Sequence, residues 1–202
     1  MNCETDFVAR NEKFQALVSS VTGAILANNP RGLLSTAELP STNHLTREAL
    51  VTITTVTDTK TLADLVAEYV GHLSENISIT RACTVGTTRG LICSYVYNNL
   101  RPPGEEVAMG TYAALLHLLP KEREEFDSVD AAVTLGRQLC QHVVGMNPQA
   151  VDVGGEVKES QALLYQDFLL DSDVTVKSLL ERNDAKVTQF VRYALGESTL
   201  EQ

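Results

Sequence analysis

The sequence predicts an α+β protein of two subdomains, residues 1–99 and 100–202, each a small antiparallel sheet packed against helices. Three observations lead to this prediction. Apolar residues recur at helical spacing in both halves of the chain. Apolar runs of strand length alternate with these helical segments. Between the halves lies a polar stretch with Pro102-Pro103-Gly104, which is typical of a connection.

The composition narrows the classes of partner. The chain has 202 residues, 44% of them hydrophobic, and a net charge of −10, so it is long enough to bury a sizeable core. Excess negative charge disfavours binding to nucleic-acid phosphates and to anionic membrane surfaces. No run approaches the ~20 apolar residues that span a bilayer. We therefore expect an acidic protein-binding module without direct nucleic-acid or membrane contact.

The first half is predicted to open with a helix. Turn-forming residues precede a helix that begins near Asn11 and ends at the Asn-Asn-Pro-Arg-Gly sequence of residues 28–32. Residues 33–60, rich in Thr, Ser and Pro, are expected to form a loop with a short helix. A second amphipathic helix is predicted over residues 62–73.

A β-hairpin is predicted next. Residues 77–85 and 91–98 are strand-like and flank a five-residue turn bounded by glycines. A turn centred in this way places Cys83 opposite Cys93, with the odd-numbered apolar positions packed against the two helices. Arg81 interrupts that apolar face, and its neighbours in the sequence give no reason for it.

The second half continues the alternation. Its central helix should point Leu135, Leu139 and Val143 inward and end before Pro148. In chain order we predict a buried strand in residues 107–119, this helix in 128–146, an acidic loop in 151–160, an apolar segment in 163–170, a short helix in 173–182 and a closing strand in 186–195.

No set of residues has the spacing of a catalytic or metal site. Cys140 and His142 are two positions apart, which places them on different sides of a helix. His44, His72 and His117 show no metal-ligand spacing. Phosphate-binding and dinucleotide-binding glycine motifs are missing. The four cysteines include no C-x-x-C pair, which argues against zinc and favours reduced thiols in a reducing compartment. We expect no catalytic residue, no metal and no cofactor, and so not an enzyme.

The stretch from Asn2 to Asn11, NCETDFVARN, is the most informative in the chain. Its spacing alone predicts a capped helix start with Phe7 folded beneath it as a hydrophobic staple. Its residues, however, closely resemble the signature of elongation factor Ts, the nucleotide exchange factor of the GTPase elongation factor Tu. LGRQLCQHVVGM at residues 135–146, FLLD at 168–171 and TQFVRYALGE at 188–197 resemble mitochondrial members. Bacterial members usually carry a long helical insertion where only the short loop of residues 154–160 stands here.

This resemblance implies two groups of partner-binding residues. In the family, the Asp-Phe pair enters the GTPase near its magnesium and nucleotide, a role that transfers to Asp6 and Phe7, with Val8 beside them. The second group is on the helix of the second half. Its members are His142, Val143 and Met146. For His142, a helix-surface or satisfied core role remains open. Magnesium belongs to the partner's site.

The implied function is guanine nucleotide exchange without covalent chemistry. The resemblance implies GDP release from elongation factor Tu during translation elongation, as a heterodimer with the GTPase in the mitochondrial matrix. The family begins with a small helical domain and a strand that are missing from this sequence, as is a transit peptide. A module that binds and stabilises elongation factor Tu without exchange is therefore the alternative. An unrelated α+β enzyme is a more distant one.

Overall fold

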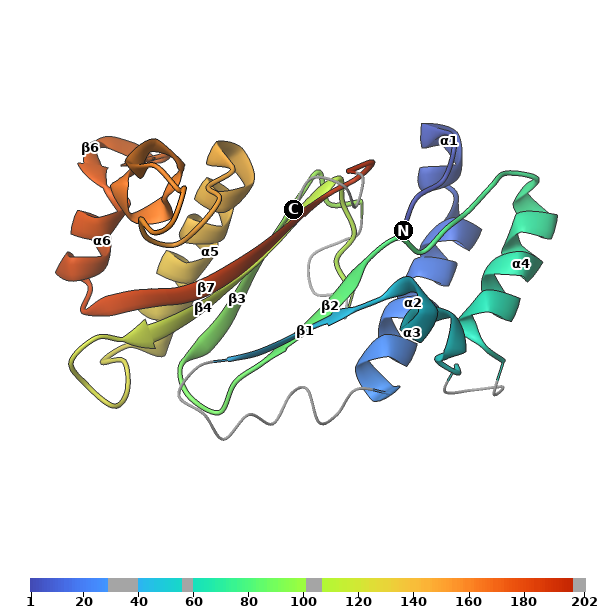
Figure 1. The fold of residues 1–202 in the computed structure, drawn as a ribbon, viewed down its shortest axis with the longest axis horizontal. Helices are drawn as coiled ribbons and strands as arrows, with labels where there is room; N and C mark the ends of the chain where they lie inside the picture. The colour runs from blue at the N-terminus through green and yellow to red at the C-terminus, as the bar shows by residue number, and fades with distance from the viewer. Residues whose placement is uncertain (29–39, 56–59, 101–106, 198–202) are drawn as a thin grey trace.

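The computed structural model describes residues 1–28, 40–55, 60–100 and 107–197 and confirms the α+β class. Two groups of helices lie at opposite ends of the long axis, with strands crossing between them (Figure 1). The first half contains α1 (Asp6–Ala9), α2 (Glu12–Asn28), β1 (Ser41–Leu45), α3 (Arg47–Thr52), α4 (Leu62–Leu73) and β2 (Ala82–Gly86). The second contains β3 (Leu91–Tyr97), β4 (Tyr112–Pro120), α5 (Val129–Met146), the 3-10 turns η2 (Glu159–Gln161) and η3 (Leu163–Tyr165), β5 (Asp167–Phe168), β6 (Asp171–Thr175), α6 (Val176–Arg182) and β7 (Ala185–Ala194).

The two predicted helices of the first half are present and form its core. Thr61 begins α4 with a capping box to Asp64, and Ser74 ends it in the left-handed conformation at φ 54°. Apolar side chains from α2, α3 and α4 form one buried cluster that includes Leu17, Val21, Leu50 and Leu62.

β1 was not predicted, although the expected short helix is present as α3. The sequence of β1, Ser-Thr-Asn-His-Leu, has no apolar alternation. It becomes a strand because its backbone pairs antiparallel with β2.

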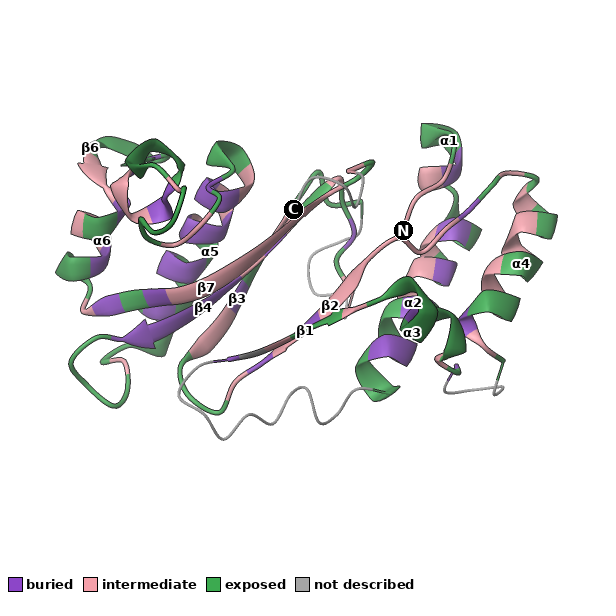
Figure 2. Ribbon diagram, in the orientation of Figure 1, coloured by how far each residue is buried: buried purple, intermediate pink, exposed green. Residues whose placement is uncertain are grey.

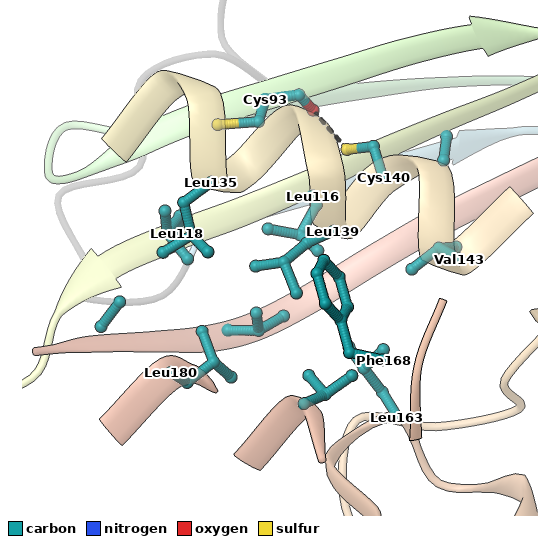
Figure 3. Close-up of a cluster of buried hydrophobic side chains, with 14 of the residues drawn as sticks. Cys93, Leu116, Leu118, Leu135, Leu139, Cys140, Val143, Leu163, Phe168 and Leu180 are labelled. Carbon is teal, nitrogen blue, oxygen red and sulfur yellow. Dashed lines mark hydrogen bonds between the residues drawn. The ribbon is translucent and has the colours of Figure 1, made fainter. Parts of the chain in front are cut away.

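The second half is a three-stranded antiparallel sheet in the order β3-β4-β7, with α5 packed on one face. Leu116 and Leu118 of β4 meet Leu135 and Leu139 of α5 in a buried cluster (Figure 3). The helix approaches β3 so closely that a Cβ on Gly136 would lie 2.1 Å from the Sγ of Cys93. The predicted central helix and closing strand of this half are confirmed, with ends shifted by one residue. The predicted strand is present but begins at Tyr112, five residues later than expected. The predicted short helix begins at Val176 rather than at residue 173, because Asp171–Thr175 pairs as strand β6.

The predicted hairpin is wrong. β2 pairs with β1 and β3 pairs with β4, so Cys83 lies opposite His44, and Cys93 lies opposite Leu116. Its predicted buried face is also wrong in β2, where Thr84 is buried and Cys83 is half-buried. The two strands are joined by a short turn but belong to different sheets. The prediction failed because alternation of apolar residues identifies a strand but not the strand that it pairs with. All four cysteines are free, as predicted.

Buried residues gather in two separate clusters, one in each half (Figure 2). By its pairing and through Cys93, β3 belongs to the second cluster. The division into subdomains at residues 99 and 100 itself stays a prediction. Within the described ranges, no helix is both long enough and apolar enough to cross a bilayer.

Candidate functional site

The single-turn helix α1 is held in place through its N-cap residue. Thr5 is its N-cap, with an extended backbone and a hydroxyl that accepts a hydrogen bond from the N–H of Val8 at 3.3 Å. The same threonine donates to the Glu75 carboxylate, from its backbone N–H at 3.1 Å and from its hydroxyl at 2.5 Å. Glu75 directly follows the end of α4. The signature is thus fixed to an element about 70 residues away in the sequence.

Phe7 and Val8 are adjacent in this short helix but differ in burial. Val8 is 8% exposed and belongs to the core of the first half, whereas Phe7 is 82% exposed. The staple interpretation of Phe7 is therefore wrong, because the ring is exposed and not folded beneath the helix. An isolated exposed apolar side chain is common on protein surfaces. Phe7 differs because the backbone that carries it is already fixed by Thr5 and Val8, which lowers the ordering cost of binding through the ring.

Asp6 presents a carboxylate beside that ring. Its closest cationic contact is Arg10, whose Nη2 lies 3.8 Å from Oδ2, with both side chains more than 70% exposed. An exposed pair at this distance contributes little to stability. The carboxylate is thus accessible to a partner together with Phe7.

The structure places His142 and Val143 in the core, with no exposed surface. The ring of His142 is stacked on Phe168 at 5.9 Å between centroids, and its Nε2 lies 2.9 Å from Oε1 of Gln166. The backbone N–H of Leu169 donates to Nδ1 at 3.1 Å. Because an amide N–H can only donate, Nδ1 carries no proton, and the ring is neutral with its proton on Nε2.

His142 therefore has the satisfied core role that the sequence left open. Burial lowers the pKa of His142, although its bond to Gln166 opposes this. Three of the six predicted contact residues are buried, namely Val8, His142 and Val143, and they do not form part of the exposed surface. The sequence carried a signal for His142, which is three positions after Leu139 and seven after Leu135 on the inward face of the helix.

Only Met146 of the second predicted group is exposed, at 42%. Leu169 and Leu170, at 47% and 53%, are exposed in the nearby segment that follows β5. A Cβ on Gly145 would lie 3.0 Å from a methyl carbon of Leu169, which shows how closely the segment approaches the end of α5. We refer to Met146, Leu169 and Leu170 as the α5-end patch. Sequence reasoning missed the two leucines as contact candidates because they lie in an apolar run that reads as core.

Cys140 and His117, the other residues considered for catalysis or metal binding, are buried and hydrogen-bonded within the core. Cys140 is fully buried, its Sγ donates to the backbone oxygen of Cys93 at 3.4 Å (Figure 3), and burial raises the pKa of its thiol. His117 is likewise buried, between the Thr188 hydroxyl and the Arg89 carbonyl, each 2.7 Å away. Among the described residues, no three His, Cys, Asp or Glu side chains gather as metal ligands would.

Comparison with known proteins identifies the family of this chain. A family model described as elongation factor TS matches residues 4–157, more than half of the chain. This chain belongs to the elongation factor Ts family. The match includes α1 with the exposed Phe7, and in the second half it extends through α5 into the acidic loop.

Relatives of this elongation factor Ts chain are named "Elongation factor Ts, mitochondrial". The protein of Nematostella vectensis is 37% identical over 97% of this chain and 72% of its own length. The protein of Salmo salar is 39% identical over 98% and 62%, and the protein of Homo sapiens is 32% identical over 98% and 61%. The chain thus spans about two thirds of the length of these relatives.

Proposed function

We propose that this chain promotes release of GDP from elongation factor Tu during translation elongation, without covalent chemistry. Membership of the elongation factor Ts family supports this proposal. The exposed ring of Phe7 on an anchored turn, next to the accessible carboxylate of Asp6, is the observation that supports assigning this function to these two residues.

The proposed mechanism is allosteric. A protein that weakens the hold of the GTPase on GDP must itself be bound less tightly when GDP is present, by the same factor. Insertion of Phe7 into the GTPase supplies a contact that differs between the two states. Burial of that ring contributes about 1.5–3 kcal/mol to the complex.

Asp6 acts through its charge. A site that binds GDP already holds phosphate groups, so a carboxylate brought close to them raises the free energy of the nucleotide-bound state. A carboxylate in this position would also attract the partner's magnesium ion and so compete with the nucleotide phosphates for it. Because the ion pair with Arg10 is weak, Asp6 loses little when it leaves that pair.

The α5-end patch is the proposed second contact in a heterodimer with the GTPase. In Figure 1, α1 and the C-terminal end of α5 both lie along the upper edge of the view, one on each half. We propose that one partner contacts α1 and the C-terminal end of α5 together. Two contacts on one rigid scaffold bind more tightly than either contact alone.

The proposed compartment is the mitochondrial matrix. The relatives are named as mitochondrial proteins, and four free thiols fit a reducing environment. Fluorescence microscopy of the full-length gene product, tagged at its C-terminus, tests the compartment. A cytosolic signal would contradict it.

The test of function is release of fluorescent GDP from purified elongation factor Tu. The wild-type chain is expected to accelerate release, and Phe7→Ala to remove most of that acceleration. Leu26→Ala is the matched control, because Leu26 is a 53% exposed apolar residue on α2, away from the signature. Asp6→Asn keeps the shape and loses the charge, so it should impair release less than Phe7→Ala.

Binding is measured in parallel by calorimetry with nucleotide-free and GDP-bound elongation factor Tu. Tighter binding to the nucleotide-free form supports exchange, as linkage requires. Equal binding to both forms, with no acceleration, would identify a stabilising module instead. No binding to either form would contradict both functions.

A further inference from the structure

Arg81, which had no explanation in the sequence, lies where the two halves meet. Its Nη2 is 2.9 Å from Oε2 of Glu197, and its guanidinium lies 4.5 Å from the ring centroid of Tyr193. Only 16% of the Arg81 side chain is exposed. The arginine immediately precedes β2 of the first half, whereas both of its partners come from the end of the chain.

The last strand of the second half, β7, faces both halves. Beyond the bulge in its pairing with β4, between Val187 and Gln189, Phe190 packs on the core of the second half and Arg192 Nε lies 3.4 Å from the Val144 carbonyl oxygen of α5. In this part of the strand the odd-numbered residues point to the first half, where the Gln189 amide donates to the Thr42 hydroxyl of β1. Tyr193 lies on this same odd-numbered face, under Arg81.

Glu197 closes the arrangement. The chain turns back after β7 at Gly196, which has a φ of +81°, and the Glu197 carboxylate accepts a hydrogen bond from the Ala194 N–H at 3.2 Å. Its other oxygen lies 2.8 Å from Nη1 of Arg192. One carboxylate thus joins an arginine of each half.

The hydrophobic clusters of the two halves share no residue. A cleft of about 660 Å³ lies at this junction, between His44 and Arg81 of the first half and two parts of the second half, β7 and residues 147–151. Gln189, Tyr193 and Glu197 also line it. The angle between the halves therefore depends on polar side chains across this cleft rather than on a common core.

We propose that Arg81 is a positioning residue, which locks the two halves at the angle that presents Phe7 and the α5-end patch to one partner. The lock consists of Arg81, Tyr193 and Glu197. This inference rests on the proposed function, because it concerns how that function's two contact regions are held relative to each other. When the halves are fixed, binding of the second contact costs no further ordering of the scaffold.

The first test measures the angle without any partner. Spin labels are introduced through unnatural amino acids at Leu26 of α2 and Val133 of α5, both exposed, and the distance distribution is measured by pulsed electron resonance. Arg81→Met keeps the aliphatic stem but loses the charge, and should broaden the distribution. Glu197→Gln acts from the other side of the lock and should do the same, without altering β2. Arg81→Lys keeps the positive charge over Tyr193 and should restore a narrow distribution.

The second test measures GDP release over a range of concentrations of the chain. Arg81→Met should raise the concentration needed for half-maximal release by about three- to tenfold, as expected for loss of a charge-assisted contact that preorganises binding. The maximal rate should not change, because Phe7 and Asp6 are untouched. Arg137→Gln, which removes an exposed arginine from α5, is the control and should leave both parameters as in the wild type.

Distinct results overturn distinct proposals. An unchanged distance distribution in folded Arg81→Met and Glu197→Gln would overturn the lock. A broadened distribution with normal release at every concentration would overturn the positioning role and leave the role of Phe7 intact. If the wild-type chain does not accelerate GDP release from elongation factor Tu, the proposed function and the positioning role are both overturned. The distance measurement would still decide whether the lock exists.

Discussion

The carboxylate of Glu75 accepts two hydrogen bonds from Thr5, one from its backbone N–H at 3.1 Å and one from its hydroxyl at 2.5 Å. Through this pair, the end of α4 holds the N-cap residue of the helical turn that carries Phe7. The remaining anchor of that turn is Val8, which is buried. The exposed ring is thus presented from a fixed backbone.

Glu75→Ala is expected to affect release of GDP more than it affects stability. The pair is largely solvent-exposed, so its loss should lower the free energy of unfolding by about 0.5–1.5 kcal/mol. Release should fall several-fold, because a mobile α1 must be ordered on binding. Glu75→Gln keeps one acceptor and should be intermediate. Denaturant unfolding and release assays on the same samples check this, and normal release by Glu75→Ala would show that the anchor is unnecessary.

Val8→Ala should lower the free energy of unfolding, whereas Phe7→Ala should leave it almost unchanged. Val8 is in the core, so its truncation should cost about 1–3 kcal/mol of unfolding free energy. Phe7 is 82% exposed, so its truncation should change that free energy by no more than about 0.5 kcal/mol. Urea unfolding monitored by circular dichroism measures both. A large loss of stability in Phe7→Ala would return the ring to a structural role.

Gly136→Ala and Gly23→Ala should change stability in opposite directions. Both glycines lie inside helices, but a Cβ at Gly136 would overlap Cys93, whereas at Gly23 it would meet no atom within 4 Å. Overpacking should make Gly136→Ala destabilising by about 1–3 kcal/mol. Higher helix propensity should make Gly23→Ala stabilising by up to about 1 kcal/mol. Melting temperatures give the signs, and stabilisation by Gly136→Ala would mean that α5 packs less closely on β3.

Stability should decline as the pH falls below about 6.5, the ordinary pKa of histidine. Burial lowers the pKa of His142, and it also lowers the pKa of His117 against an opposing hydrogen bond to Arg89. The unfolded chain therefore binds more protons than the folded chain in this range, so protonation favours unfolding. Each histidine contributes a slope of at most about 1.4 kcal/mol per pH unit, which applies only between its folded and unfolded pKa values.

Unfolding by urea at a series of pH values from 8 to 5 measures this dependence. His142→Gln should be less stable overall, but its stability should fall less steeply with decreasing pH. A His142→Gln slope equal to that of the wild type would show that His142 is not kept neutral by folding.

The sequence by itself determined the helices and most of the strands of this protein. Helical periodicity and caps are local, so α2, α4 and α5 could be read from neighbouring residues, and Ser128 is the observed N-cap of α5. Family membership was also readable, because NCETDFVARN keeps a specific order of residues. The exposed Phe7 could be expected only from that resemblance, since its spacing alone favoured a staple.

Pairing between strands was decided by the tertiary structure. A glycine-bounded turn between two strand-like segments is equally compatible with a hairpin and with passage from one sheet to another. The chain takes the second course, since β2 finds its partner in β1 and β3 finds its partner in β4. Alternation along a strand specifies a face but not a neighbour.

Arg81 is the clearest case of a residue whose role the local sequence does not show and only the folded chain explains. Its ion-pair partner Glu197 is 116 positions away, and Tyr193 beneath it lies on the last strand. Nothing near Arg81 in the sequence favours a partly buried charge, because the compensation comes from residues that only the folded chain brings to it. Helices and motifs depend on residues within a few positions of each other, so the sequence displays them directly. The junction between the halves depends on contacts across the whole chain, which exist only after both halves have folded.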